Sequence, residues 1–150
     1  MIEFRLNDRS TRVDVAPMAS LASVLREQLA LPGTKVACGE GFCGSCTVLV
    51  DEQPVAACLL PVVHAAGRSV RTVEGLASFG RLSPIQQVLE DADAVQCGMC
   101  FPGIVMSLTA LLERTPRPTK PQIHEALVGN ICRCTGYERV VTAVLQLAGA

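Results

Sequence analysis

Eight cysteines are the residues of this 150-residue chain best suited to chemistry, and they form two groups of four. The first group is Cys38, Cys43, Cys46 and Cys58, with the spacing C-x4-C-x2-C-x11-C. An opening of C-x4-C-x2-C is the spacing of plant-type [2Fe–2S] sites. Glycines interleave with the first three cysteines, and glycine permits the tight backbone turns that leave amide N–H groups free to point at cluster sulfur. The spacing therefore predicts a [2Fe–2S] cluster in the first half of the chain.

A structural zinc site is the main alternative for this first group. Zinc also takes four cysteines, but such sites usually present two C-x2-4-C pairs. Here three cysteines share one loop and Cys58 stands alone, which suits a cluster better. Disulfides fit less well, because the charged start of the chain, with Glu3 and Arg5, indicates neither a secretory signal nor a membrane span. We expect a cytoplasmic, reducing compartment, where cysteines are more often metal ligands or reactive thiols.

The second group is Cys97, Cys100, Cys132 and Cys134, with the spacing C-x2-C-x31-C-x-C. Both pairs lie in turns between predicted helices, and an antiparallel bundle would bring these turns together at one end. The spacing alone is compatible with a cluster, a zinc site or a redox-active C-x-x-C pair. A thioredoxin-like dithiol would need a βαβ setting, which this half of the chain does not indicate.

The elements expected around the first group are strands and one helix. Residues 2–7 and 11–15 alternate in character around 7–10 and predict a hairpin, and residues 21–29 have helical spacing. Three further short strands are expected over 47–50, 54–57 and 69–73. The hairpin of 47–57 should return Cys58 to the cysteine loop. These elements predict a small α+β domain.

The second half of the chain reads as helical throughout. Helices are predicted over 84–91, 103–114, 119–128 and 137–148. Ser83 and Thr119 are suitable N-caps. Gly129–Asn130 is a sequence typical of turns and should end the third helix. Residues 75–82 contain glycine and serine residues typical of a linker. We therefore place the domain boundary there, between residues 1–76 and 77–150.

Composition narrows the possible partners. The formal charge is −1, and basic and acidic residues are balanced in both halves of the chain. Because there is no basic stripe to neutralise phosphates, nucleic acid is not an expected partner, and no segment predicts membrane insertion. Apolar residues make up 49% and charged residues only 18%. That balance fits either a well-packed globule or a subunit that buries much of its surface against other chains.

Three strings make the sequence similar to a known family. CGEGFCGSCTVLVD, AVQCGMCFPG and GNICRCTGY occur in this order, with TVEGLA at 72–77 and a proline-rich turn at 116–119. Together they resemble the iron–sulfur subunit of the molybdenum hydroxylases, the family of xanthine dehydrogenase, aldehyde oxidoreductase and carbon monoxide dehydrogenase. The resemblance covers essentially the whole chain. It implies a plant-ferredoxin-like (β-grasp) domain over 1–76 and an all-α four-helix domain over 77–150, each binding one [2Fe–2S] cluster.

The resemblance also implies a function. The chain would be the electron-transfer subunit of an oxidoreductase complex, relaying single electrons from a molybdenum centre to FAD or another acceptor. The partners would be a large molybdopterin-binding subunit and a medium FAD-binding subunit. The resemblance makes Cys97, Cys100, Cys132 and Cys134 the ligands of the cluster nearer molybdenum, and Cys38, Cys43, Cys46 and Cys58 the ligands of the distal cluster. It places Gln96 and Cys134 close to the pterin.

Two other functions stay open at this point. A free-standing two-cluster ferredoxin would carry the same cysteines, although a diffusing carrier should show a charged docking face. A zinc protein that mediates assembly is the other. In none of the three is a residue of this chain expected to act as an acid, a base or a nucleophile, and eight cysteines complete two sites without His64 or His124.

Two residues depart from the family pattern. Phe101 follows Cys100 where relatives commonly carry threonine, and Phe42 stands where a charged or polar residue is common. Phe101 could dry the site around Cys100 and change a cluster potential, but packing variation at an interface is the interpretation that we favour.

Overall fold

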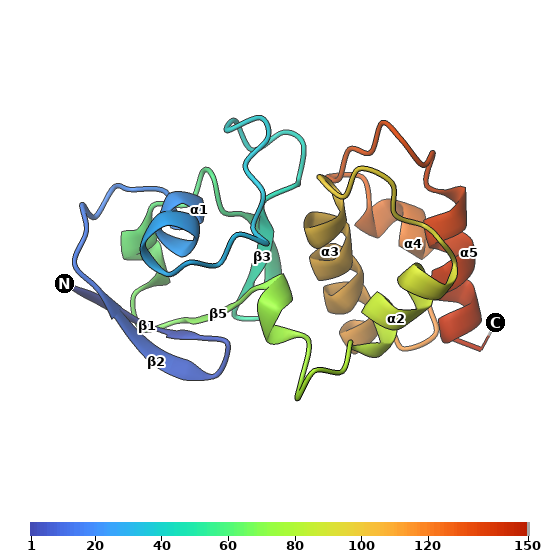
Figure 1. Cartoon of the computed structure of the whole chain (residues 1–150), viewed down its shortest axis with the longest axis horizontal. Coiled ribbons are helices and arrows are strands. Elements are labelled where there is room, and N and C mark those ends of the chain that lie inside the picture. Colours follow the sequence, from blue (N-terminus) through green and yellow to red (C-terminus); the bar gives the residue numbers. More distant parts are fainter. Residues whose placement is uncertain (150) are drawn as a thin grey trace.

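The structure, a computed structural model, describes residues 1–149 and combines a five-stranded mixed sheet with five α-helices. The sheet and all five of its strands belong to the N-terminal half, and the longer helices follow in the C-terminal half (Figure 1). The predicted α+β class is confirmed. Within the described residues, no helix is both long enough and apolar enough to cross a membrane.

The sheet begins with a tighter hairpin than the sequence predicts. Strands β1 (Ile2–Leu6) and β2 (Arg9–Val13) are joined by Asn7 and Asp8 alone, which both have positive φ, at 45° and 68°. This is the two-residue turn whose twist matches the twist of the strands. The expected turn over 7–10 is therefore wrong, because residues 9 and 10 already pair with β1.

Three more strands complete the sheet in the order β2-β1-β5-β3-β4. Strands β3 (Thr47–Val50) and β4 (Gln53–Ala56) form an antiparallel hairpin, and β5 (Ser69–Arg71) lies parallel to β1 and antiparallel to β3. Every residue of β3 is buried, since Val48 and Val50 face the core of the N-terminal half while Leu49 faces the helices.

The first predicted helix is present but is not a regular α-helix. Helix α1 covers only Leu21–Ser23 and continues as the π-helical segment η1 (Val24–Gln28), in which the Leu29 N–H donates to the Val24 carbonyl at 3.1 Å. The apolar spacing of residues 21–29 does not distinguish 3.6 residues per turn from the wider π turn. Short 3₁₀ turns η2 (Val62–Ala65) and η3 (Val73–Gly75) flank β5.

The helical half contains the four helices that the periodicity predicts, within a few residues at each end. They are α2 (Pro84–Asp91), α3 (Phe101–Arg114), α4 (Lys120–Ala126) and α5 (Glu138–Leu147). Ser83 and Thr119 form capping boxes with Gln86 and Gln122, which satisfies the first free N–H groups of α2 and α4. The buried residues of these helices form a second core, separate from the one beneath the sheet.

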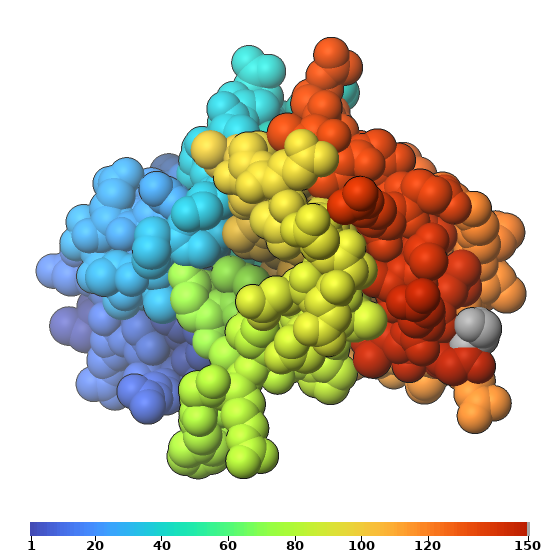
Figure 2. Space-filling model, turned by 45° about the vertical axis from the view of Figure 1, so that its right-hand side comes forward, coloured from blue at the N-terminus to red at the C-terminus, as the bar shows by residue number. Residues whose placement is uncertain are grey.

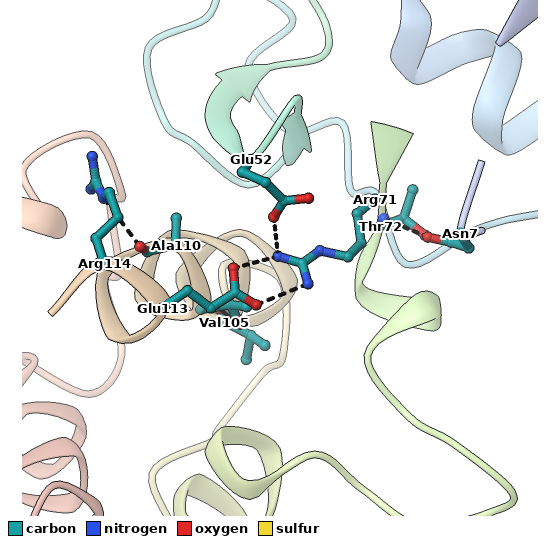
Figure 3. A network of polar contacts seen from close by, with 9 residues as sticks. Asn7, Glu52, Arg71, Thr72, Val105, Ala110, Glu113 and Arg114 are labelled. Atoms are coloured by element: carbon teal, nitrogen blue, oxygen red, sulfur yellow. Dashed lines mark hydrogen bonds and ion pairs between the residues drawn. The ribbon is translucent and has the colours of Figure 1, made fainter. Parts of the chain in front are cut away.

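Helix α3 joins the two halves. Its Met106 and Ala110 pack on Leu49 of β3, with Val73 and Leu76 at the edge of this contact. At the helix end, the Glu113 carboxylate accepts two hydrogen bonds from the Arg71 guanidinium of β5, at 2.9 and 2.6 Å (Figure 3). Arg71 also pairs with Glu52 in the β3–β4 turn. An apolar contact and a bidentate ion pair therefore hold the halves together.

We expect Glu113→Gln to loosen this junction modestly. Arg71 keeps Glu52 as a partner, so the free energy of unfolding should fall by about 1 kcal/mol, the upper range for a partly exposed ion pair. Urea denaturation would measure the change. The matched control is Glu138→Gln, which breaks the exposed Lys120–Glu138 pair within the helical half and should change stability little. Equal effects of the two variants would contradict a special role for the Arg71 pair.

Candidate metal centres

The first cysteine group is assembled by one loop and one hairpin. Cys38, Cys43 and Cys46 lie between η1 and β3, and Cys58 follows β4. Because β3 and β4 pair from Thr47 with Ala56, the end of β4 returns beside Cys46, and the Cys58 N–H lies 3.4 Å from the Cys46 sulfur. The hairpin thus does what the sequence suggested and returns the fourth cysteine to the loop.

Backbone amides in the loop point at these sulfur atoms. The Glu40 N–H lies 3.4 Å from Cys38 Sγ, and the Gly41 N–H lies 3.2 Å from Cys58 Sγ. Gly41 has a φ of +71°, a conformation that L side chains rarely adopt and that turns its N–H inward. The hydrogen bond from Glu40 is the main cause that lowers the pKa of Cys38 to about 6, whereas burial raises the pKa of Cys46 to about 11.

The second cysteine group is assembled by two inter-helix loops at one end of the helical half. Cys97 and Cys100 lie between α2 and α3, and Cys132 and Cys134 lie between α4 and α5. The sulfur atoms of Cys97 and Cys134 are 3.6 Å apart. Figure 2 shows both these loops, yellow and orange-red, at the upper edge of the molecule near the cyan loop of the first group.

The four sulfurs of this second group differ in exposure. Cys97 and Cys134 are exposed, whereas Cys100 and Cys132 are buried. Burial, with the neighbouring Cys132, raises the pKa of Cys100 to about 12. Burial also acts to raise the pKa of Cys132, but hydrogen bonds led by that of Thr135 outweigh it and lower the pKa to about 7. Each group of four therefore contains one thiol whose pKa is lowered and one buried thiol whose pKa is raised, and a bound cation would favour the thiolate form of both.

Neighbouring thiols in both groups influence one another. The pKa of Cys38 is affected by Cys43, that of Cys46 by Cys58 and that of Cys100 by Cys132, and the Cys97 and Cys134 sulfurs are 3.6 Å apart. Neighbouring pairs of thiols suit a [2Fe–2S] cluster, because each of its two irons takes two protein ligands. A structural zinc ion requires four ligands around one point. Paired thiols therefore suit a binuclear cluster in each group.

Gln96 and Cys134, which the resemblance placed together, are neighbours. The Gln96 side-chain amide donates to the Cys134 carbonyl at 3.2 Å, and both residues are exposed beside Cys97. The histidines stand elsewhere, with His64 exposed on η2 and His124 exposed on α4. Phe101 packs against the second core, and Phe42 is 73% exposed at the tip of the first cysteine loop.

The structure adds two residues to the second site that the sequence did not indicate as functional. The Thr135 hydroxyl lies 3.0 Å from Cys132 Sγ, and the Thr135 N–H lies 3.5 Å from the same sulfur. The Tyr137 hydroxyl accepts a hydrogen bond from the Cys132 N–H at 2.8 Å. Tyr137 also packs against the second core just before α5. The position of both residues within three residues of Cys134 is the only signal in the sequence.

The two cysteine groups are hydrogen-bonded to each other. The Ile131 N–H, one residue before Cys132, donates to the Cys43 carbonyl at 2.9 Å. The side chain of Asn130 donates to the Gly44 carbonyl at 3.1 Å. The loops of the two candidate centres therefore meet directly, although more than 80 residues separate them in the sequence.

Each cysteine group lies in a region that matches a known [2Fe-2S] family. Residues 4–68 match the family described as the 2Fe-2S iron-sulfur cluster binding domain, and residues 72–145 match the [2Fe-2S] binding domain. The chain is 47% identical to the nicotine 6-hydroxylase small subunit of Paenarthrobacter nicotinovorans, over 99% of this chain and 89% of the relative. It is 44% identical to aldehyde oxidase 2 of Rattus norvegicus over 93% of its own length, but spans only 11% of that protein.

A solved structure is similar over the same length. The crystal structure of quinoline 2-oxidoreductase from Pseudomonas putida 86 contains a chain that superposes with a TM-score of 0.95 at 38% sequence identity. The alignment covers 99% of this chain and 93% of that chain, so both cysteine groups lie within it.

Proposed function

The chain belongs to the iron–sulfur subunits of the molybdenum hydroxylases, and from this premise we propose that it is the electron-transfer subunit of such a complex. It would relay single electrons from a molybdenum centre on a partner chain, through two [2Fe–2S] clusters, to FAD or another acceptor. The observation that carries the proposal is the hydrogen bond between the Ile131 N–H and the Cys43 carbonyl, which joins the two cysteine groups.

The proposal assigns the eight cysteines to two clusters. Each bound cluster would accept and release one electron at a time. Cys38, Cys43, Cys46 and Cys58 would hold the distal cluster in a β-grasp, plant-ferredoxin-like domain over residues 1–76. Cys97, Cys100, Cys132 and Cys134 would hold the proximal cluster in a four-helix domain over residues 77–150, of which residue 150 lies outside the described part. The two separate cores support this division into domains.

The short connection between the loops supports electron transfer within the chain. Cys43 would be a ligand of one cluster, and its carbonyl accepts the hydrogen bond of the residue that precedes Cys132, a ligand of the other. The path from the Cys43 sulfur to the Cys132 sulfur consists only of covalent bonds and this one hydrogen bond. Electronic coupling is stronger along bonded atoms than across empty space, so this arrangement suits transfer between two one-electron centres.

The exposed edge of the second site suggests where the partner binds. Gln96, Cys97 and Cys134 form a surface on which ligand atoms of the proximal cluster are accessible. We propose that the large molybdopterin-binding subunit covers this surface and brings its cofactor to Gln96 and Cys134. A medium FAD-binding subunit would then receive electrons from the distal cluster. The oxidation of the substrate would occur on the partner's cofactor, with no acid, base or nucleophile from this chain.

Purification of the native complex tests this function. We expect about four irons and four sulfides per chain, as two [2Fe–2S] clusters require, and co-elution with a large molybdopterin-containing chain. Anaerobic substrate should reduce both clusters, each with its own EPR signal. Zinc in place of iron would overturn the proposal. So would a chain that elutes alone with both clusters and is reduced only by other carriers.

Thr135→Val should lower the reduction potential of the proximal cluster. A ligating thiolate carries no proton, so the Thr135 hydroxyl must donate to Cys132 Sγ, 3.0 Å away. Such a bond stabilises the more negative, reduced cluster. Its loss should cost the reduced state up to about 1.5 kcal/mol more than the oxidised state, or up to about 65 mV for one electron. EPR-monitored redox titration measures the shift, and Thr142→Val, on the exposed side of α5, is the control. An unchanged or raised potential would contradict the prediction.

A further inference from the structure

We propose that Asn130 is a positioning residue that locks the two cysteine loops together and so sets the rate of electron transfer between the two clusters. The inference rests on the proposed function. It concerns a side chain that holds no metal and was expected only to form a turn after Gly129. Asn130 does form that turn, since its N–H donates to the Leu127 carbonyl at 2.9 Å. Its side chain, however, points to the other half of the molecule.

Asn130 is connected to both cysteine loops. Its side-chain amide donates to the carbonyl of Gly44, the residue after Cys43, at 3.1 Å. Its own backbone carbonyl accepts a hydrogen bond from the Tyr137 hydroxyl at 2.9 Å, and that hydroxyl in turn accepts from the Cys132 N–H at 2.8 Å. One buried residue, 3% exposed, thus links the backbone beside one ligand to the backbone of another.

The attachment point in the first loop is itself fixed. The Gly44 carbonyl also accepts hydrogen bonds from the Thr47 hydroxyl at 2.7 Å and from the Thr47 N–H at 3.1 Å. Thr47 begins the buried strand β3, so the carbonyl is held by the sheet. Asn130 therefore fastens the loop between α4 and α5 to a rigid point rather than to a flexible one.

The segments around Asn130 approach as closely as backbone permits. A Cβ atom placed on Gly103 of α3 would lie 2.0 Å from the Gly44 carbonyl oxygen, and one placed on Gly44 would lie 2.0 Å from the Gly129 oxygen. Both positions would also bring the added atom near the Asn130 amide, at 3.2 and 2.7 Å. Three chain segments therefore meet with no space for a side chain, and Asn130 supplies a side-chain hydrogen bond between the loops at this point.

This junction lies next to the connection that would carry electrons. Asn130 and Gly44 immediately adjoin Ile131 and Cys43, the two residues whose backbones share the 2.9 Å hydrogen bond. If the loops separate, that bond is replaced by a through-space gap, and the coupling between the clusters falls steeply. Neither cluster loses a ligand in the process. The side chain should therefore affect the coupling of the clusters and not their assembly.

Asn130→Asp in the native complex is the test, because it keeps the shape of the side chain but turns an acceptor oxygen toward the Gly44 carbonyl. Loss of a buried donor should shift the equilibrium between docked and separated loops by about 5- to 150-fold. We expect full iron content and both EPR signals. We also expect inter-cluster electron transfer after flash reduction to slow, by up to the same factor, with a weaker magnetic splitting when both clusters are reduced. Asn130→Ala, which adds no charge, should change both quantities in the same direction by less.

The control is Glu113→Gln, which loosens the same junction of the two halves away from the cysteine loops and should leave splitting and rate unchanged. A wild-type rate and splitting in both Asn130 variants would overturn the inference while leaving the proposed function intact. Loss of iron from both variants would also overturn it, because Asn130 would then serve assembly. Failure of the proposed function is distinct, because the wild-type complex itself would then show no transfer between clusters.

Discussion

Replacing Cys43 with serine is expected to abolish the EPR signal of the distal cluster and to leave the proximal signal unchanged. Cys43 belongs to the group assembled by the first loop and the β3–β4 hairpin, whereas the four cysteines proposed to hold the proximal cluster lie between residues 97 and 134 in inter-helix loops. The Cys43 carbonyl belongs to the backbone, so the hydrogen bond from Ile131 survives the substitution. Loss of the distal cluster should therefore leave the proximal cluster in place.

The functional consequence should be a block between the clusters. Substrate would still reduce molybdenum and the proximal cluster, but turnover with the final acceptor should fall by more than about 100-fold, because loss of even an outer partner of a metal site costs 10–100-fold. Freeze-quench EPR with anaerobic substrate, together with steady-state turnover, measures both effects.

Cys100→Ser is the mirror-image control. It should remove the proximal signal, keep the distal one, and stop electrons before they leave molybdenum. Loss of both EPR signals from a folded Cys43→Ser complex would contradict two independent sites and would indicate a single shared metal centre.

The two cysteine groups differ in how far the sequence alone could define them. The spacing of Cys38, Cys43 and Cys46 is compact and directly indicates a plant-type cluster. The pairs at 97–100 and 132–134 become one site only when α2 to α5 pack together, which no local pattern encodes. Only the resemblance assigned them a common cofactor. The 3.6 Å separation of the Cys97 and Cys134 sulfurs shows that the fold does bring these pairs together.

Local signals predicted most element boundaries well. The capping residues Ser83 and Thr119 precede α2 and α4 as expected. A capping box forms between residues three positions apart, so the local sequence is enough to predict it. The failures have local causes too. The hairpin turn is shorter than predicted because Asn7 and Asp8 both tolerate positive φ. The first helix widens into a π turn, which the apolar pattern of so short a segment does not distinguish from an α turn.

The role proposed for Asn130 illustrates what no local pattern could reveal. In the sequence, Gly129–Asn130 is a sufficient helix stop, and that interpretation is correct as far as it goes. The hydrogen bond to Gly44 spans 86 positions and depends on glycines at 44 and 103 that let three backbones touch. When a local role already explains a residue, the sequence does not indicate that the residue also makes a long-range contact.

Gly44→Ala should be among the most damaging substitutions outside the cysteines. Gly44 has a φ of +70°, which costs an L-residue about 1–2 kcal/mol. The new Cβ would also lie 2.0 Å from the Gly129 carbonyl oxygen, a backbone atom that cannot simply rotate away. Overpacking of this kind typically costs a further 1–3 kcal/mol. We expect a total loss of about 2–5 kcal/mol and separation of the two cysteine loops.

Gly67→Ala separates these two causes, because Gly67 has the same φ of +70° but no atom within 4 Å of an added Cβ. It should incur only the conformational cost of about 1–2 kcal/mol and leave the clusters untouched. Thermal denaturation of the complex, followed by cluster absorbance, compares the two variants. A larger loss in Gly44→Ala, together with a weaker magnetic splitting between the clusters, would show that the close approach of the backbones holds the loops together. Equal losses would mean that the φ angle alone requires glycine at position 44, and that the contact with Gly129 is not a constraint on the distance between the clusters.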